Sequence, residues 1–299
     1  MKVRYRFLYS FLIITLFTAL FSFKALAEEP DKQHDGENKL DIIEKVVDHD
    51  YVDFYFLGKL HLPKIPKVTI GGITFDFSVT KSLFMMFLSS IILLFVLRRA
   101  AVINTKNPVP RGVGNFIEPV IVFIRDEIVL PNMGKEGLRL LPFFLTLFFF
   151  ILFANIIGLI PFMAQPTKNI SVTTGLALVS FAMIQINGMK KNGVLGYFKG
   201  LVPHGIPAFV LPIMIIVEFI GLFTKPFALL MRLFANITAG SIIIMSLLGL
   251  IFIMNWAGVA IAVPFALFIY FLELFVALLQ AYIFTMLSVI FINMAMHQH

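Results

Sequence analysis

The sequence predicts an all-α integral membrane protein with about five membrane-crossing segments, the last two long and tilted, and one amphipathic helix on the cytoplasmic surface. Two observations predict this class. Of the 299 residues, 59% are hydrophobic and only 14% are charged, whereas soluble domains carry about 25% charged residues. Several apolar stretches are also long enough to span a bilayer, which a soluble protein with a very apolar core does not require.

The N-terminus has the pattern of a secretory signal peptide. Three basic residues lie among the first six, an apolar run covers residues 7–23, and an Ala-Leu-Ala triplet ends at Ala27. A basic start, an apolar middle and an A-x-A site define such a signal. Residues 1–27 are therefore predicted to be removed, with a retained anchor helix as the alternative.

Residues 28–80 are predicted to form an external segment. Residues 28–50 hold nine acidic side chains and three lysines, a composition that cannot bury a core. From 51 to 80, apolar and polar residues alternate around Gly71 and Gly72, which predicts a small β-hairpin. The membrane domain then covers residues 81–299.

Basic residues next to the first and third spans predict the orientation of the chain in the membrane. Basic pairs follow the first span, at Arg98 and Arg99, and the third span, at Lys190 and Lys191. Positive residues mark the cytoplasmic side, so the mature N-terminus is predicted to be periplasmic and the C-terminus cytoplasmic, in a bacterial inner membrane. The three spans are expected at residues 83–97, 140–162 and 172–186, and the amphipathic helix at 112–135.

The last hundred residues hold two unusually long apolar stretches, at 209–254 and 256–296. As helix, each would extend about 60 Å at 1.5 Å per residue, but the hydrocarbon core is only about 30 Å thick. Each stretch is therefore a broken pair of spans or one long tilted helix. No charged turn interrupts either stretch, which favours two tilted helices, with Pro226 and Pro264 as candidate kinks.

Ionisable residues lie inside these apolar stretches. After Glu136 the only acidic residues are Glu218 and Glu273, and the first stretch also holds Lys225 and Arg232. A charged side chain at the bilayer centre costs at least about 2.5 kcal/mol and is normally placed against a partner or a water-filled path.

The spacing of these residues puts them on two polar stripes. Glu218, Lys225 and Arg232 are seven residues apart, which is nearly two helical turns, so they share a face with Asn236 one turn further on. A second stripe on the last helix contains two residues, also seven apart, Glu273 and Gln280.

Arg232 differs from the other ionisable residues in its chemistry. A guanidinium stays protonated, so it cannot relay a proton, but it can force a nearby carboxylate to ionise. Glu218 and Glu273 can titrate and are candidates for relaying protons. The alternative is that the two stripes pair with each other and only hold the helices together.

Residues 224–240, with the sequence TKPFALLMRLFANITAG, resemble the signature helix of F-type ATP synthase subunit a. Its core is Lys-Pro, then Arg-Leu-Phe-x-Asn, then Ala-Gly. Residues 278–284, LLQAYIF, are similar to the final-helix motif of the same family. The resemblance covers roughly residues 80–299 and is specific, because two motifs occur in the expected order.

The resemblance implies a role for each polar residue. Arg232 would face the carboxylate of the rotating c-ring, Asn236 would lie beside it, and Gln280 would approach it from the last helix. The remaining three, Glu218, Lys225 and Glu273, match polar positions that line the ion path. Many bacterial members carry an acid where this chain has Ser241, and histidine where it has Glu273, so the resemblance implies that one acid has changed helix.

The resemblance implies the proton-channel subunit of the membrane sector, with two access half-channels and an arginine gate that couple ion flow to c-ring rotation and ATP synthesis. Such a subunit has no catalytic activity of its own, contacts the c-ring, the b subunits and the lipid bilayer, and needs no cofactor, metal or nucleic acid. H⁺ and Na⁺ both remain open as the coupling ion. There are two alternatives. One is a stand-alone secondary transporter, and the other is a membrane scaffold without transport, in which Arg232→Ala would have no effect.

Overall fold

The computed structural model describes residues 51–54, 58–61, 68–70, 73–75, 81–106, 112–160, 165–200 and 209–297. The predicted signal peptide and the acidic residues 28–50 lie outside these ranges. Within the described residues, five helical segments are long and apolar enough to cross a membrane, as predicted: Lys81–Val102, Leu141–Leu159, Ile170–Asn192, Ile213–Leu247 and Gly258–Met296.

Two small antiparallel hairpins precede the helices. Strand β3 (Val68–Ile70) pairs with β4 (Ile73–Phe75), which confirms the hairpin predicted around Gly71 and Gly72. The hairpin formed by β1 (Tyr51–Phe54) and β2 (Gly58–His61) was not predicted. Apart from these four short strands, the described residues are almost entirely helical, so the predicted fold class is confirmed.

The first membrane helix, α3 (Lys81–Lys106), is followed by a helix in three parts. These are α4 (Val113–Phe123), a π-helical stretch η1 (Ile124–Val129) and α5 (Leu130–Gly137). The apolar side chains of Ile124, Ile128 and Val129 are buried, while the charged residues between them are partly or fully exposed. This segment therefore has the amphipathic character predicted for residues 112–135.

Helix α6 (Leu141–Leu159) lies at the centre of the bundle and packs against α3 and α9. Most of its residues are buried, including a run of phenylalanines from Phe148 to Phe150. A helix that is apolar on every side is stable only when neighbours cover it. The sequence of α6, which has no charged residue, therefore places it inside the bundle.

A tight connection joins α6 to the next span. The short helix η2 (Pro166–Lys168) leads into α7 (Ile170–Asn192), and the Asn169 side chain caps α7 by accepting a hydrogen bond from the backbone N–H of Ser171 at 2.8 Å. At the other end, Gly193 adopts a φ of 72°, which glycine tolerates best. Helix α8 (Val194–Gly200) follows directly.

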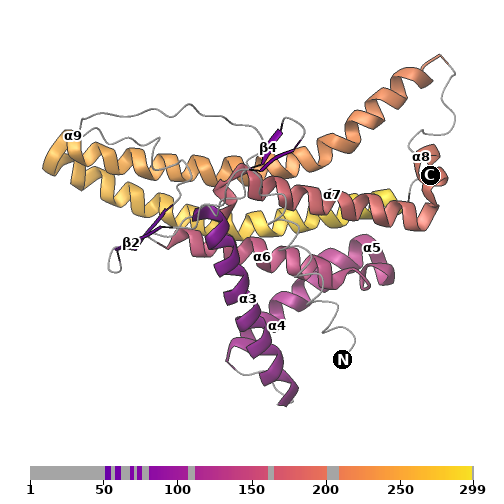
Figure 1. Ribbon diagram of the computed structural model, residues 1–299. Helices are drawn as coiled ribbons and strands as arrows, with labels where there is room; N and C mark the ends of the chain where they lie inside the picture. The colour runs from indigo at the N-terminus through magenta and orange to yellow at the C-terminus, as the bar shows by residue number, and fades with distance from the viewer. Residues whose placement is uncertain are drawn as a thin grey trace.

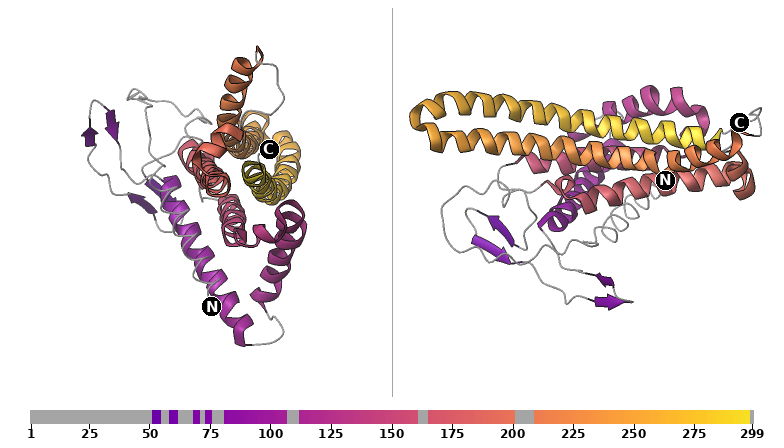
Figure 2. Two further views of the ribbon diagram at one scale, coloured as in Figure 1. Left: turned by 90° about the vertical axis from the view of Figure 1, so that its right-hand side faces the viewer. Right: turned by 90° about the horizontal axis from the view of Figure 1, so that it is seen from above.

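The last helix, α9 (Leu211–Met296), folds back on itself as a hairpin of two long arms. The arms are Ile213–Leu247 and Gly258–Met296, of 35 and 39 residues, and Figure 2 shows them side by side. Helical structure continues through Pro226 and Pro264. The prediction of two long helices is confirmed, and the broken-pair alternative is wrong. An arm of 35 residues extends about 52 Å, so it must tilt to stay in a hydrocarbon layer of about 30 Å.

The hairpin gives the bundle two distinct ends, visible in Figure 1. We call the end where α6 finishes and α7 begins the η2 end, because it contains η2. The opposite end, where α7 finishes and both termini of α9 lie, contains α8 and is called the α8 end. The tip of the α9 hairpin extends past the η2 end (Figure 1).

Candidate ion-translocation site

The two polar stripes face each other across the α9 hairpin. The Asn236 side chain donates a hydrogen bond to Gln280 Oε1 at 3.1 Å, and a Cβ built on Gly240 would collide with the Glu273 carboxylate. A later residue of the first arm thus lies opposite an earlier residue of the second arm, as antiparallel arms require. The structure thus brings together residues of both predicted stripes, one from each arm.

Arg232 is exposed on the first arm. Among the described residues it forms no ion pair and no hydrogen bond through its side chain. Lys225 instead lies over the ring of Phe291, with Nζ 5.9 Å from the centroid, a cation–π distance. In the described part of the chain neither Glu218 nor Glu273 pairs with these cations within 4.0 Å. Within the described residues, the ionisable groups of the two stripes therefore do not pair with each other, while Asn236 and Gln280 do link the two arms, as the alternative of a purely structural contact requires.

Glu273 lies near the η2 end, beside Gly240 and Ser241 of the opposite arm. Its Oε1 atom is buried and has no hydrogen-bond partner among the described residues. Ser241 is buried, on the side of its helix away from exposed Arg232, as its spacing of nine residues predicts. Positions 241 and 273 are neighbours in space.

Glu218 lies near the α8 end, where the polar residue Tyr197 approaches it. Tyr197 of α8 has no exposed surface, and its hydroxyl has no hydrogen-bond partner in the described structure. The pKa of Tyr197 is raised, mainly because the side chain is buried. The nearby Gln185 amide partly offsets this increase, and Glu218 adds to it. The Tyr197 hydroxyl and the Gln185 amide are therefore buried polar groups that lie near each other at this end of the bundle.

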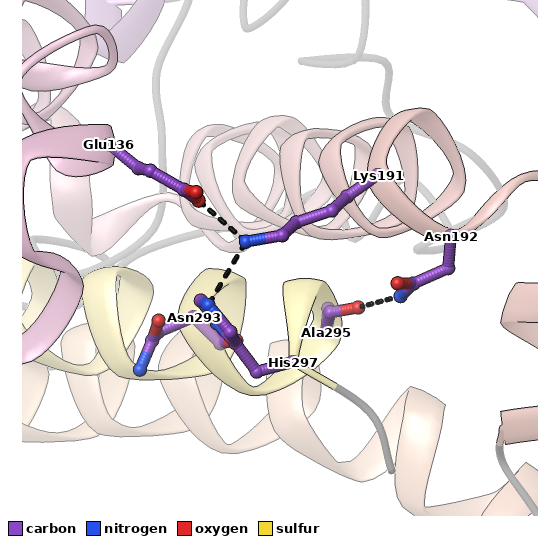
Figure 3. Close-up of polar contacts among 6 residues, drawn as sticks. All are labelled: Glu136, Lys191, Asn192, Asn293, Ala295 and His297. Carbon is purple, nitrogen blue, oxygen red and sulfur yellow. Dashed lines mark hydrogen bonds and ion pairs between the residues drawn. The ribbon is translucent and has the colours of Figure 1, made fainter.

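Side chains at the α8 end tie α5, α7 and α9 together (Figure 3). Lys191 Nζ donates to Glu136 Oε2 at 2.6 Å and lies 3.0 Å from His297 Nε2. The side chain of Asn192 donates to the Ala295 carbonyl at 3.1 Å. The hydrogen bond from Lys191, more than its charge alone, holds the pKa of Glu136 below its usual range. This contact is therefore present at neutral pH and is lost as the pH falls through that lowered pKa.

Gly188 provides a test of how closely α8 packs on α7. A Cβ at this position would lie 2.5 Å from the Tyr197 ring and 3.0 Å from the Ala295 carbonyl oxygen. We expect Gly188→Ala to destabilise the protein by about 1–3 kcal/mol, the usual cost of overpacking. Thermal unfolding of the detergent-solubilised complex measures this, with Gly221→Ala as the matched control, because Gly221 has open space around it. Equal melting temperatures for the two variants would contradict the packing described here.

All six residues predicted for the ion path lie on α9: Glu218, Lys225, Arg232, Asn236, Glu273 and Gln280. Sequence reasoning missed Lys168, which the fold places near Glu273, and also Gln185 and Tyr197. Lys168 was visible as a lone charge in a short turn, but nothing in the sequence shows how near that turn lies to Glu273.

This fold and set of ionisable side chains define a multi-pass membrane protein of the ion-translocating class. Residues 83–293 match the family described as ATP synthase A chain. The chain belongs to this family.

Curated relatives support the same family. The chain is 48% identical over 268 residues to ATP synthase subunit a of Chloroherpeton thalassium. The aligned region covers 88% of this chain and 78% of the relative. It is 47% identical to ATP synthase subunit a of Myxococcus xanthus, with 80% of each chain covered. It is 43% identical to ATP synthase subunit a 2 of Chlorobaculum tepidum, covering 85% of this chain and 72% of the relative.

Proposed function

We propose that this chain is the proton-translocating subunit of the membrane sector of an F-type ATP synthase. The observation that carries the proposal is the position of Arg232, a permanent cation exposed on a long apolar arm. A carboxylate lies nearer to each end of the bundle, at Glu273 and Glu218. A fixed charge between two titratable groups separates two ion paths.

In this mechanism a proton enters at the η2 end and reaches Glu273. It then passes to a carboxylate on the rotor, which contacts the exposed face of the first arm. Arg232 favours the ionised form of any rotor carboxylate that approaches it, so the proton leaves before that carboxylate passes. The exit path runs toward the α8 end past Glu218, beside which the buried Tyr197 and Gln185 supply polar side chains.

Arg232 also prevents direct flow between the two paths. A unit charge crossing 100 mV releases about 2.3 kcal/mol, and a leak would dissipate that energy without rotation. Asn236 and Gln280 fix the arms against each other one turn from the arginine. The subunit itself performs no bond chemistry, and ATP synthesis takes place in another part of the complex.

The proposed orientation places the α8 end in the cytoplasm of a bacterial cell with the chain in its inner membrane. Lys190 and Lys191 lie at that end of α7, and positive residues favour the cytoplasmic side. The η2 end and residues 28–80 then face the periplasm, once residues 1–27 are removed. The rotor partner is a c-ring, and b subunits complete the stator.

The function is tested by comparing inner-membrane vesicles from cells with and without this chain. We expect ATP-driven proton pumping to disappear without the chain, while ATP hydrolysis by the soluble sector persists, because only the membrane path is lost. Re-expression of the full chain should restore pumping. Transport by the purified chain in liposomes that contain no other subunit would instead favour the stand-alone transporter.

A further inference from the structure

Lys168 is held in a fixed position at the η2 end. The neighbouring Thr167 hydroxyl donates a hydrogen bond to Asn155 Oδ1 of α6 at 2.7 Å, and both side chains are buried. On the other side, Asn169 caps α7. A three-residue helix secured at both ends has little freedom, so the position of Lys168 is set by α6 and α7.

The second arm of α9 is attached to the same region. The Tyr270 hydroxyl donates a hydrogen bond to the Leu159 carbonyl, at the last residue of α6, over 2.6 Å. Tyr270 precedes Glu273 by less than one helical turn, so Glu273 lies close to η2, which also contacts α9 directly. Lys168 is partly buried there and lies near Glu273, with no ion pair between the two described side chains within 4.0 Å.

Among the residues that the structure describes, few other groups can compensate the charge of Glu273. Gly240 leaves no space for a side chain, and Ser241 offers only a hydroxyl. Helix α6 has no titratable residue, and the only ones on α7, Lys190 and Lys191, lie at the α8 end. The remaining charged neighbour in the described part of the chain is Lys81 at the start of α3. Burial is the main cause that lowers the pKa of Lys168, Lys81 lowers it further, and Glu273 raises it.

We propose that Lys168 is a positioning residue for proton entry, whose positive charge sets how readily Glu273 releases its proton. This inference rests on the proposed function. A carboxyl group in an apolar environment retains its proton, and a nearby cation favours the ionised form. With Lys168 in place, Glu273 accepts a proton from external water and passes it to the rotor carboxylate. Without the lysine, Glu273 stays protonated to higher pH.

The test uses four variants of the assembled enzyme in proteoliposomes: Lys168→Gln, Lys168→Arg, Glu273→Gln and Lys190→Gln. ATP synthesis is driven by a potassium diffusion potential, with equal pH on both sides, from about pH 6 to about pH 9. We expect Lys168→Gln to move the midpoint of the pH profile upward by about one unit, as loss of a neighbouring opposite charge does. Lys168→Arg retains the charge and should keep the wild-type profile. Lys190→Gln removes an exposed lysine at the other end and is the matched control.

Each other outcome has a defined meaning. An unchanged profile for Lys168→Gln, with synthesis impaired in Glu273→Gln, overturns the role of Lys168 and leaves the proposed function intact. Equal losses at every pH in Lys168→Gln and Lys168→Arg also overturn it, because they indicate a purely structural role. Wild-type synthesis in Glu273→Gln shows that the proposed entry path is wrong, and the role of Lys168 is then rejected with it.

Discussion

Replacing Arg232 with alanine is expected to lower ATP-driven proton pumping at least about 20-fold, because no other described residue can act as a permanent cation at that point of the path. Lys225, two turns away on the same arm, is engaged with the ring of Phe291. Without the guanidinium, the rotor carboxylate has no fixed charge to force release of its proton.

The same substitution should leave assembly intact. The Arg232 side chain is exposed and, among the described residues, has no hydrogen bond or ion pair whose loss would weaken the fold. Immunoblots of the purified complex check this point, and Met231→Ala serves as a control because Met231 is the exposed neighbour of the arginine. Undiminished pumping by an assembled Arg232→Ala complex would exclude the gate and return the scaffold to consideration.

The helices could be predicted because each carries a local signal. The uncharged sequence of α6 and the basic residues that end α7 both follow from the solvent properties of a bilayer. Even the hairpin at Gly71 and Gly72 has a sequence pattern of its own. The two long arms of α9 were more difficult to predict from the sequence. Their apolar stretches are too long for one upright span, and that length fits either one tilted helix or two short helices.

The candidate site could be predicted only where its residues share one helix. Arg232 and Glu218 belong to one stripe, and their spacing reveals it. Lys168 and Tyr197 reach α9 from separate elements, so their relation to Glu273 and Glu218 depends on tertiary packing. A lysine in a turn and a tyrosine in a short helix are common in any sequence, and only their burial here makes them candidates for the site.

Replacing Glu273 is expected to cause the second large loss of proton pumping. We expect Glu273→Gln to reduce ATP-driven pumping at least about tenfold, because a glutamine cannot carry a titratable proton. The loss should reflect the missing carboxyl group and not a change in shape, since glutamine has nearly the same volume. Pumping by inner-membrane vesicles at fixed amounts of assembled complex measures the effect. Pumping above half of the wild-type rate would show that protons do not pass through this residue.

The acid should also function from the opposite arm. Ser241 is buried beside Glu273, so a carboxyl group placed there occupies the same section of the entry path. We expect Ser241→Glu, added to Glu273→Gln, to restore pumping to within about threefold of wild type. Ala239→Glu in the same background is the control, because Ala239 is exposed on the same arm, and it should restore nothing. Rescue by both additions would mean that any nearby acid suffices, whereas rescue by Ser241→Glu alone would show that the path requires a carboxyl group at one point between the arms, whichever helix supplies it.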